Sequence, residues 1–340
     1  MLLKNYKYYN QVNYWFLILL CLIFLLVLIG GLTRLTNSGL SITEWEVFSG
    51  ILPPLSNQKW DEYFLMYKQI PQYKLNENMT LNEFKIIFYW EYVHRILARI
   101  IGLAYLIPLI IFTFNKTFFK KELILLYSIF IIILFQGFLG WYMVKSGLVH
   151  DVTVSHFRLG IHLVTAFFLI MLIYWCYLNF KNKEKKKLFL ITKDNLKFKF
   201  FIILILLQIL IGAYVSGLDA GKIYQTWPLM NNSYFPDDVK NLSFIDFFKF
   251  EHQSVVQFIH RNLAYFIFFY TILLFINILK EKHKYLIPYI SIVLLILVIQ
   301  IFLGIFTLIS GVNIIFASLH QIIGLFLFIY VIKLNYYSVK

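Results

Sequence analysis

Charged side chains are scarce in this sequence. Only 14% of the 340 residues are Asp, Glu, Lys or Arg, whereas 60% are hydrophobic. Soluble globular domains carry charge on about a quarter of their residues, so this composition excludes an ordinary soluble protein. Cysteine is almost absent as well. Cys21 and Cys176 both lie within apolar runs, which excludes a disulfide framework and a cysteine metal cluster. The composition therefore indicates a protein whose solvent is the lipid bilayer.

Long apolar runs fill most of the chain. A helical run of about 20 apolar residues crosses the roughly 30 Å of bilayer hydrocarbon. Eight such runs are separated by short polar connections. We predict helices over residues 14–35, 84–114, 122–144, 155–177, 198–217, 253–279, 285–308 and 316–333. The predicted fold is an all-α integral membrane protein with eight transmembrane helices.

The basic residues are concentrated in alternate loops. A formal net charge of +14 would indicate a nucleic-acid partner in a soluble protein, but Lys and Arg gather here at residues 4–7, 116–121, 181–199 and 280–284. Membrane proteins keep such clusters on the cytoplasmic side, where they contact lipid headgroups. We therefore expect both termini in the cytoplasm and no nucleic acid. The neutral or acidic connections, including residues 37–83, should face outward.

The amino terminus gives an expectation about the compartment. It lacks the Arg- and Ser-rich amphipathic character of a mitochondrial transit peptide. No signal-peptide cleavage site follows its first apolar run. We therefore expect a bacterial inner membrane.

The two halves of the chain resemble each other at four places. The matched residues lie at the ends of spans one and five and just after them, or within spans two and six, three and seven, and four and eight. They are Gly30, Gly31, Asn37, Gly39 and Trp45 with Gly212, Ala213, Asp219, Gly221 and Trp227; Glu91, His94 and Arg95 with Gln257, His260 and Arg261; Gln136 and Gly140 with Gln300 and Gly304; and His162 with His320.

This correspondence predicts a tandem repeat. Each copy has an even number of spans, so the copies are parallel and form two four-helix bundles related by a pseudo-two-fold axis. We place the first half at residues 1–180, a basic cytoplasmic linker at 181–197 and the second half at 198–340. The glycines alone have a structural alternative, since small residues let helices approach closely in lipid. Parallel repeats also occur in transporters.

Four of the matched residues are histidines inside spans, where polar residues are costly and tend to mark function. His94, His162, His260 and His320 lie at a similar shallow depth from the outer ends of their helices. Two neutral imidazoles on facing helices are a usual way for a bundle to hold a six-coordinate haem. A single histidine has the alternative of a hydrogen-bonded packing residue, but the pairing favours iron ligands. His156 lies about 240° around the helix from His162 and cannot face the same iron.

One matched position differs in its chemistry, with Glu91 in the first half and Gln257 in the second. Glu91 shares a helical face with His94 at a spacing of i and i+3. A carboxylate in a dry site can shuttle protons or stabilise a developing cation, and an amide can do neither. We therefore predict chemistry in the first half and an electron-carrying haem in the second. The alternative is that Glu91 is an ion-pair partner of Arg95.

Two arginines, Arg95 and Arg261, directly follow a predicted ligand. Propionates are the charged groups of a haem, and guanidinium groups bind carboxylates through charge-assisted hydrogen bonds. We predict that both arginines bind haem propionates.

Three stretches together resemble the haem A synthase family in its alphaproteobacterial and mitochondrial type. They are GGLTRLTNSGLSITEW at 30–45, ILPPLSNQKWDEYFLMYKQIPQY at 51–73 and WEYVHR at 90–95. The similarity extends over nearly the whole chain, and the combination is specific although each piece is not. Members of this family oxidise the C8 methyl group of haem O to the formyl group of haem A, the prosthetic group of terminal cytochrome oxidases.

The resemblance implies a role for each predicted site residue. It implies a resident haem b on His260 and His320, and substrate haem O at His94 and His162 with Glu91 as the catalytic acidic residue. It also implies water as the oxygen source, electrons leaving through haem b to an acceptor, a haem O synthase as a partner, and a homo-oligomer. Gram-positive relatives carry a cysteine pair in an outer loop. This chain lacks that pair, which removes a redox role for a disulfide.

Two other functions fit the histidine pairs. One is a dihaem cytochrome b that passes electrons between quinol and a partner. The other is a haem transporter or chaperone that performs no chemistry. The difference between Glu91 and Gln257 favours the synthase, because a protein that only transfers electrons would not need a carboxylate in one half and an amide in the other.

Overall fold

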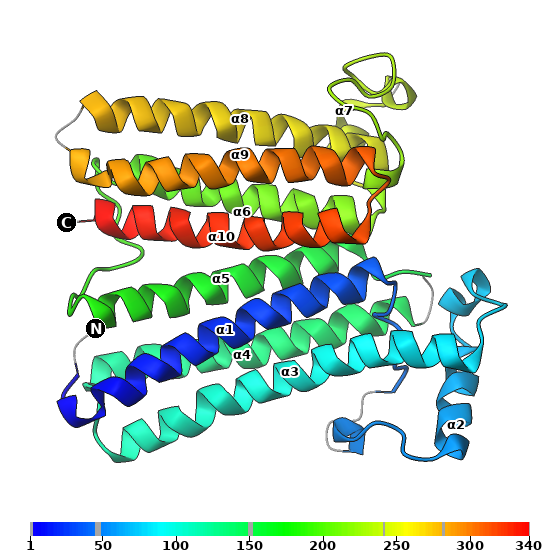
Figure 1. The fold of residues 1–340 in the computed structure, drawn as a ribbon, viewed down its shortest axis with the longest axis horizontal. Coiled ribbons are helices and arrows are strands. Elements are labelled where there is room, and N and C mark those ends of the chain that lie inside the picture. Colours follow the sequence, from blue (N-terminus) through cyan, green and yellow to red (C-terminus); the bar gives the residue numbers. More distant parts are fainter. Residues whose placement is uncertain (1–2, 45–48, 149–151, 241, 281–282, 340) are drawn as a thin grey trace. The chain divides into compact units, whose positions relative to one another are not determined.

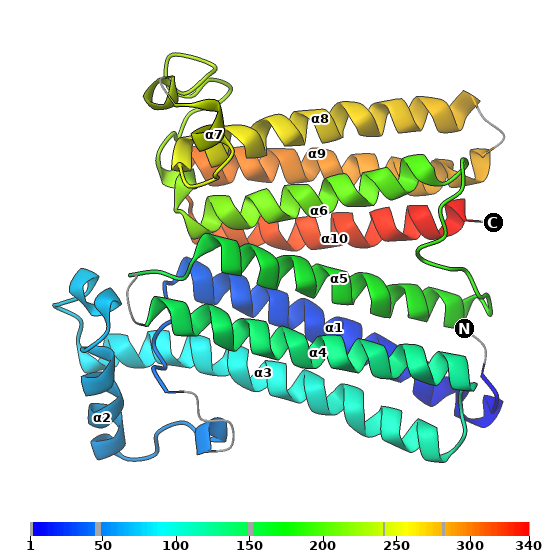
Figure 2. The same cartoon turned by 180° about the vertical axis from the view of Figure 1, so that it is seen from behind.

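The protein is described by a computed structural model over residues 3–44, 49–148, 152–240, 242–280 and 283–339. Within these ranges the regular structure is helical and no strand is formed. Eight helices are long and apolar enough to cross a membrane (Figures 1 and 2), which confirms the predicted fold class. They are α1 (Tyr9–Leu35), α3 (Leu81–Phe114), α4 (Lys120–Gly147), α5 (His156–Lys181), α6 (Leu196–Gly217), α8 (Gln253–Lys280), α9 (Ile287–Ile309) and α10 (Ile314–Ser338).

The helices group into two units, residues 2–173 and 174–340. The first unit contains α1, α3, α4 and most of α5, and the second contains the end of α5 with α6, α8, α9 and α10. In both views the long helices of each unit run side by side (Figures 1 and 2). The boundary falls within α5, a little before the predicted end of the first half at residue 180. The tandem repeat itself stays a prediction, and Trp45, one of its matched residues, lies outside the described residues.

Helix α3 begins at a capping box. The Thr80 hydroxyl accepts a hydrogen bond from the Glu83 amide, and the Glu83 carboxylate accepts one from the Thr80 amide. Together these contacts satisfy two amide donors that the first helical turn leaves unpaired.

Polar side chains link the spans of the first unit. The Trp15 indole of α1 donates to the Ala104 carbonyl of α3 at 2.9 Å, and the Tyr105 hydroxyl of α3 donates to the Leu126 carbonyl of α4 at 2.9 Å. Such donors need partners inside the protein because hydrocarbon offers none. They therefore fix how α1, α3 and α4 pack.

The connection after α1 contains a helix that the apolar-run pattern did not predict. Helix α2 (Asn57–Tyr67) buries Trp60, Phe64 and Tyr67, which share one helical face. This face packs against Phe84 and Phe88 in the first turns of α3. Helix α3 begins at Leu81, before its predicted start at residue 84, and Leu81 packs against the same cluster.

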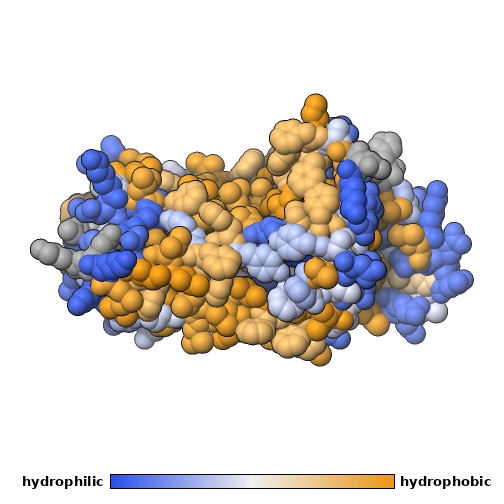
Figure 3. Space-filling view, turned by 90° about the horizontal axis from the view of Figure 1, so that it is seen from above, coloured by the Kyte–Doolittle hydropathy of each residue, from blue (hydrophilic) through white to orange (hydrophobic). Residues whose placement is uncertain are grey.

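The outer faces of the spans are apolar. Figure 3 shows hydrophobic side chains over the middle of one face and hydrophilic ones gathered toward its ends. Exposed residues such as Ile131, Leu273 and Leu295, each at least 60% accessible, lie on these faces. Surfaces of this kind suit contact with lipid.

Candidate functional site

The four predicted ligand histidines lie on four different helices, two in each unit. His94 is on α3 and His162 on α5, whereas His260 is on α8 and His320 on α10. Each residue is half-buried. Within each unit the two predicted ligands are near enough to influence each other electrostatically, so each predicted pair is close in space.

Each of these imidazoles rests on a glycine of another helix in its unit. A β-carbon added to Gly30 of α1 would lie 3.0 Å from Cε1 of His94. The equivalent distances are 3.2 Å from Gly140 to His162, 3.1 Å from Gly212 to His260 and 2.9 Å from Gly304 to His320. Real side chains rarely approach so closely, so the missing β-carbon is what makes room for each ring. Besides the helix packing given above as an alternative, these four glycines thus accommodate the rings, and we call them the histidine seats.

Three of the rings also approach a glutamine amide of the neighbouring helix. The amide nitrogens of Gln136, Gln208 and Gln300 lie 3.5, 3.3 and 3.3 Å from the Nε2 atoms of His162, His260 and His320, respectively. The sequence analysis paired Gln136 with Gln300 but missed Gln208. A polar residue within an apolar run, four residues before a matched glycine, was the signal that would have found it.

The histidine pairs fit a haem by their donor chemistry. Nδ1 of His94, His162 and His260 is buried with no hydrogen-bond partner among the described residues. Buried polar atoms left in this way are uncommon. No group of three or more His, Cys, Asp or Glu within the described ranges could hold a bare metal ion. Two imidazoles from neighbouring helices suit a metal whose other ligands come from its own cofactor, as those of haem iron come from the porphyrin.

Glu91 is enclosed by hydrogen-bond donors. One carboxylate oxygen, Oε1, lies 2.6 Å from Nη2 of Arg95. The other, Oε2, accepts from the Ser41 hydroxyl at 2.8 Å and from the Ile42 amide at 2.9 Å. Glu91 is only 2% exposed. The ion pair with Arg95, which the sequence analysis treated as an alternative, is therefore present, and the loop after α1 supplies two donors that the sequence did not predict.

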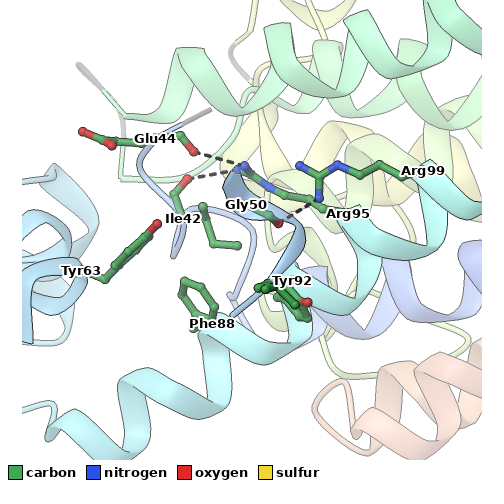
Figure 4. Close-up of a pocket in the computed structure, with 9 residues that line it drawn as sticks. Ile42, Glu44, Gly50, Tyr63, Phe88, Tyr92, Arg95 and Arg99 are labelled. Atoms are coloured by element: carbon green, nitrogen blue, oxygen red, sulfur yellow. Dashed lines mark hydrogen bonds between the residues drawn. The ribbon is translucent and has the colours of Figure 1, made fainter. Parts of the chain in front are cut away.

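Arg95 also holds the loop after α1. Its Nη2 donates to the Ile42 carbonyl at 3.1 Å and its Nη1 to the Glu44 carbonyl at 3.4 Å. One turn further along α3, Arg99 donates to the Gly50 carbonyl at 3.2 Å. These contacts line a cavity of about 20 Å³ (Figure 4), which has room for a water molecule but not for a haem.

The second unit has contacts of the same kind. Arg261 donates to the carbonyls of Tyr224 and Thr226 at 3.1 and 2.9 Å, and the Gln257 amide donates to the Tyr224 carbonyl at 3.0 Å. The Tyr224 hydroxyl donates to Asp238 at 2.6 Å. Burial, followed by this hydrogen bond, raises the pKa of Tyr224. The structure therefore shows Arg95 and Arg261 binding loop carbonyls, and their predicted contact with propionates stays a prediction.

Comparisons with known proteins agree on the family. The model of a family described as "Cytochrome oxidase assembly protein", COX15-CtaA, matches residues 13–332. A protein named Heme A synthase from Pelagibacter ubique is 48% identical over 326 residues, which is 95% of each chain. The Heme A synthase of Bartonella quintana is 41% identical over 95% of this chain and 90% of its own length. That of Rickettsia bellii is 42% identical, with 92% and 94% covered.

Proposed function

The chain belongs to the COX15-CtaA family of cytochrome oxidase assembly proteins, and we propose that it is a haem A synthase that oxidises the C8 methyl group of haem O to a formyl group. The observation that carries this proposal is the likeness to proteins named Heme A synthase along nearly the whole chain. The two histidine pairs support it, because the reaction requires one haem as substrate and a second redox centre.

We assign different tasks to the two pairs. His260 and His320 would hold a resident haem b, which supplies a route for electrons to an acceptor. His94 and His162 would receive the substrate haem. Support for this division comes from Glu91, which lies one turn from His94, whereas the second unit has Gln257 at the matched position.

Glu91 gives the first unit a fixed negative charge. Four donors bind its carboxylate, namely Nε and Nη2 of Arg95, the Ser41 hydroxyl and the Ile42 amide. Oxidation of a methyl group removes electrons next to the porphyrin ring and leaves cationic character, which a nearby carboxylate stabilises electrostatically. Water then supplies the oxygen atom. We propose this electrostatic role for Glu91, with Arg95 and the loop after α1 holding it in position.

We also propose a setting for the reaction. The chain is a multi-pass membrane protein, and its basic loops support the placement of both termini in the cytoplasm. The lack of transit-peptide character at the amino terminus supports a bacterial inner membrane. A haem O synthase would deliver the substrate, an acceptor would take the electrons, and the chain would assemble as a homo-oligomer.

Co-expression with a source of haem O tests the proposal. The wild-type chain should yield haem A on chromatography of the extracted haems. Glu91→Gln should stop this while keeping the fold and the haem b content, since Gln257 shows that an amide fits the matched position. Glu83→Gln removes a carboxylate from the exposed start of the same helix and should keep full activity.

Other outcomes would identify the competing functions. Two haem b groups that quinol reduces, with no haem A, would indicate a dihaem cytochrome. Bound haem released unchanged would indicate a transporter. Full haem A production by Glu91→Gln would refute the role of Glu91.

A further inference from the structure

Helix α4 carries three exposed aromatic side chains in a row, which we call the aromatic stripe. Phe135, Phe138 and Tyr142 are between 44% and 51% accessible, and at i, i+3 and i+7 they share one helical face. The Phe138 ring is stacked with those of Phe135 and Tyr142, each at 6.2 Å between centroids. Helix α4 lies on the near side of its unit in Figure 2. At 1.5 Å per residue, the stripe runs for roughly 10 Å along the helix.

Two cations lie where the aromatic stripe ends, near the carboxy-terminal end of α4. Nζ of Lys145 lies 5.0 Å from the ring centroid of Trp141, and Cζ of Arg158 lies 4.0 Å from that of Tyr142. Nη1 of Arg158 also donates to the Tyr142 carbonyl at 3.0 Å. The cation–ring contacts hold both charges on neighbouring rings. A guanidinium stacks through its face and has five N–H donors along its edge, so Arg158 can still bind an oxyanion.

The second unit has the same place without the charges. Its residues at the matched positions, counted from the glycine and histidine pairs of the sequence match, are apolar. They are Phe306 for Tyr142, Ile309 for Lys145 and Phe316 for Arg158. The rings of Phe306 and Phe316 are stacked at 5.7 Å, where the first unit has its contact between Arg158 and Tyr142. Helix packing at this place therefore needs no charge, and the two cations of the first unit serve another purpose.

An anionic phospholipid has the chemistry that this surface would recognise. Its phosphate can bind a guanidinium through charge-assisted hydrogen bonds. Each Lys or Arg near the membrane surface favours an anionic headgroup by about five-fold. Trp and Tyr side chains gather at the level of the headgroups, and exposed Phe side chains suit contact with acyl chains. A free anion would use the cations and leave the rings without a role.

We propose that Lys145 and Arg158 bind the headgroup of an anionic phospholipid whose acyl chain lies along the aromatic stripe. The lipid belongs to the leaflet at the carboxy-terminal end of α4. Arg158 precedes the predicted ligand His162 by one turn of α5, so the site lies close to the histidine pair of the first unit. The matched face of α9 accepts any lipid, because it has no cation to select a headgroup.

Photo-crosslinking in nanodiscs tests the inference. The full-length protein is placed in phosphatidylcholine that contains a trace of a lipid with a diazirine on its acyl chain, either phosphatidylglycerol or phosphatidylcholine. Mass spectrometry then maps the labelled residues. On residues 135–142 the phosphatidylglycerol probe should label about 30-fold more than the phosphatidylcholine probe, because two cations contribute about five-fold each. Residues 299–306 of α9 are the internal control and should show no such preference.

Variants that carry the residues of the second unit test the two cations. Arg158→Phe with Lys145→Ile should abolish the preference on α4, and each single variant should keep about five-fold. The second unit folds with these side chains at the matched positions, so the fold should be kept, which gel filtration checks. If the double variant does not fold, Lys145→Ile alone carries the test, since Lys145 is exposed. Lys121→Ile, at the other end of α4, is the matched control and should keep the full preference.

Three results would overturn the inference. The first is equal labelling of α4 by the two probes. The second is loss of the preference when inorganic phosphate is added in excess, which would identify a site for a free anion. The third is no labelling of α4 by either probe, together with crosslinks between the α4 helices of two chains, which would assign the aromatic stripe to contact with a second copy.

Discussion

The guanidinium of Arg95 and the carboxylate of Glu91 form an ion pair at 2.6 Å across one turn of α3, with side chains only 12% and 3% exposed. The second carboxylate oxygen is occupied by donors from Ser41 and Ile42. Arg95 therefore neutralises the charge of Glu91, and both carboxylate oxygens of Glu91 accept hydrogen bonds. Glu91 depends on this cation, because without it the carboxylate would be a buried and uncompensated charge, whereas Arg95 also donates to the carbonyls of Ile42 and Glu44.

Replacing Arg95 by leucine should destabilise the protein strongly. Glu91 would lose its cation and stay buried, which costs about 3–5 kcal/mol in the free energy of unfolding. Unfolding of the purified protein in detergent, followed by tryptophan fluorescence, measures this loss. The double variant with Glu91→Gln should recover much of it, since an amide needs no counter-ion. Equal stability of Arg95→Leu and the wild type would show that the pair contributes nothing.

Adding a methyl group to a histidine seat should impair haem binding. Gly304→Ala places a β-carbon 2.9 Å from Cε1 of His320 and must displace the ring. We expect a loss of haem b, measured as haem per protein and as the low-spin absorption spectrum. Gly137→Ala is the matched control, because a β-carbon there meets no atom within 4 Å. If both variants kept their haem, the glycine would not be needed for the ligand.

Cysteine labelling tests the proposed orientation. His283→Cys lies in the basic connection after α8, and Asn232→Cys lies in the exposed loop between α6 and α8. A membrane-impermeant maleimide should label residue 232 in intact spheroplasts and residue 283 only after lysis. The parent chain, with Cys21 and Cys176 inside spans, provides the background. Labelling of residue 283 in intact spheroplasts would reverse the topology.

The sequence predicts the spans well because apolar length is a local property. All eight spans form helices, and their ends shift by several residues at most. The pairing of His94 with His162 and of His260 with His320 could also be proposed, because polar residues are rare enough in spans to be matched between the halves. Direct contact between each ring and a glycine could not be foreseen, since it depends on how two helices pack.

Contacts between loops and helices could not be predicted from the sequence. Trp60 and Phe64 lie in a largely polar connection, so the short helix α2 gives no long apolar run. Ser41 and Ile42 reach Glu91 from about 50 residues away along the chain. Gln208 was not predicted as a site residue. A single glutamine in an apolar span does not indicate a function until the residue that it contacts on the neighbouring helix is known.

Arg95 and Arg261 hold two loops through backbone carbonyls, not through loop side chains. Arg95 holds the carbonyls of residues 42 and 44, and Arg261 holds those of residues 224 and 226. Every residue supplies a carbonyl, so the loop can change almost any side chain and keep its path. The stretches 37–44 and 219–226 illustrate this tolerance, since they share only Gly39 and Gly221. Each loop can therefore acquire a new side-chain function, such as the Ser41 hydroxyl beside Glu91, without losing its attachment to the helix.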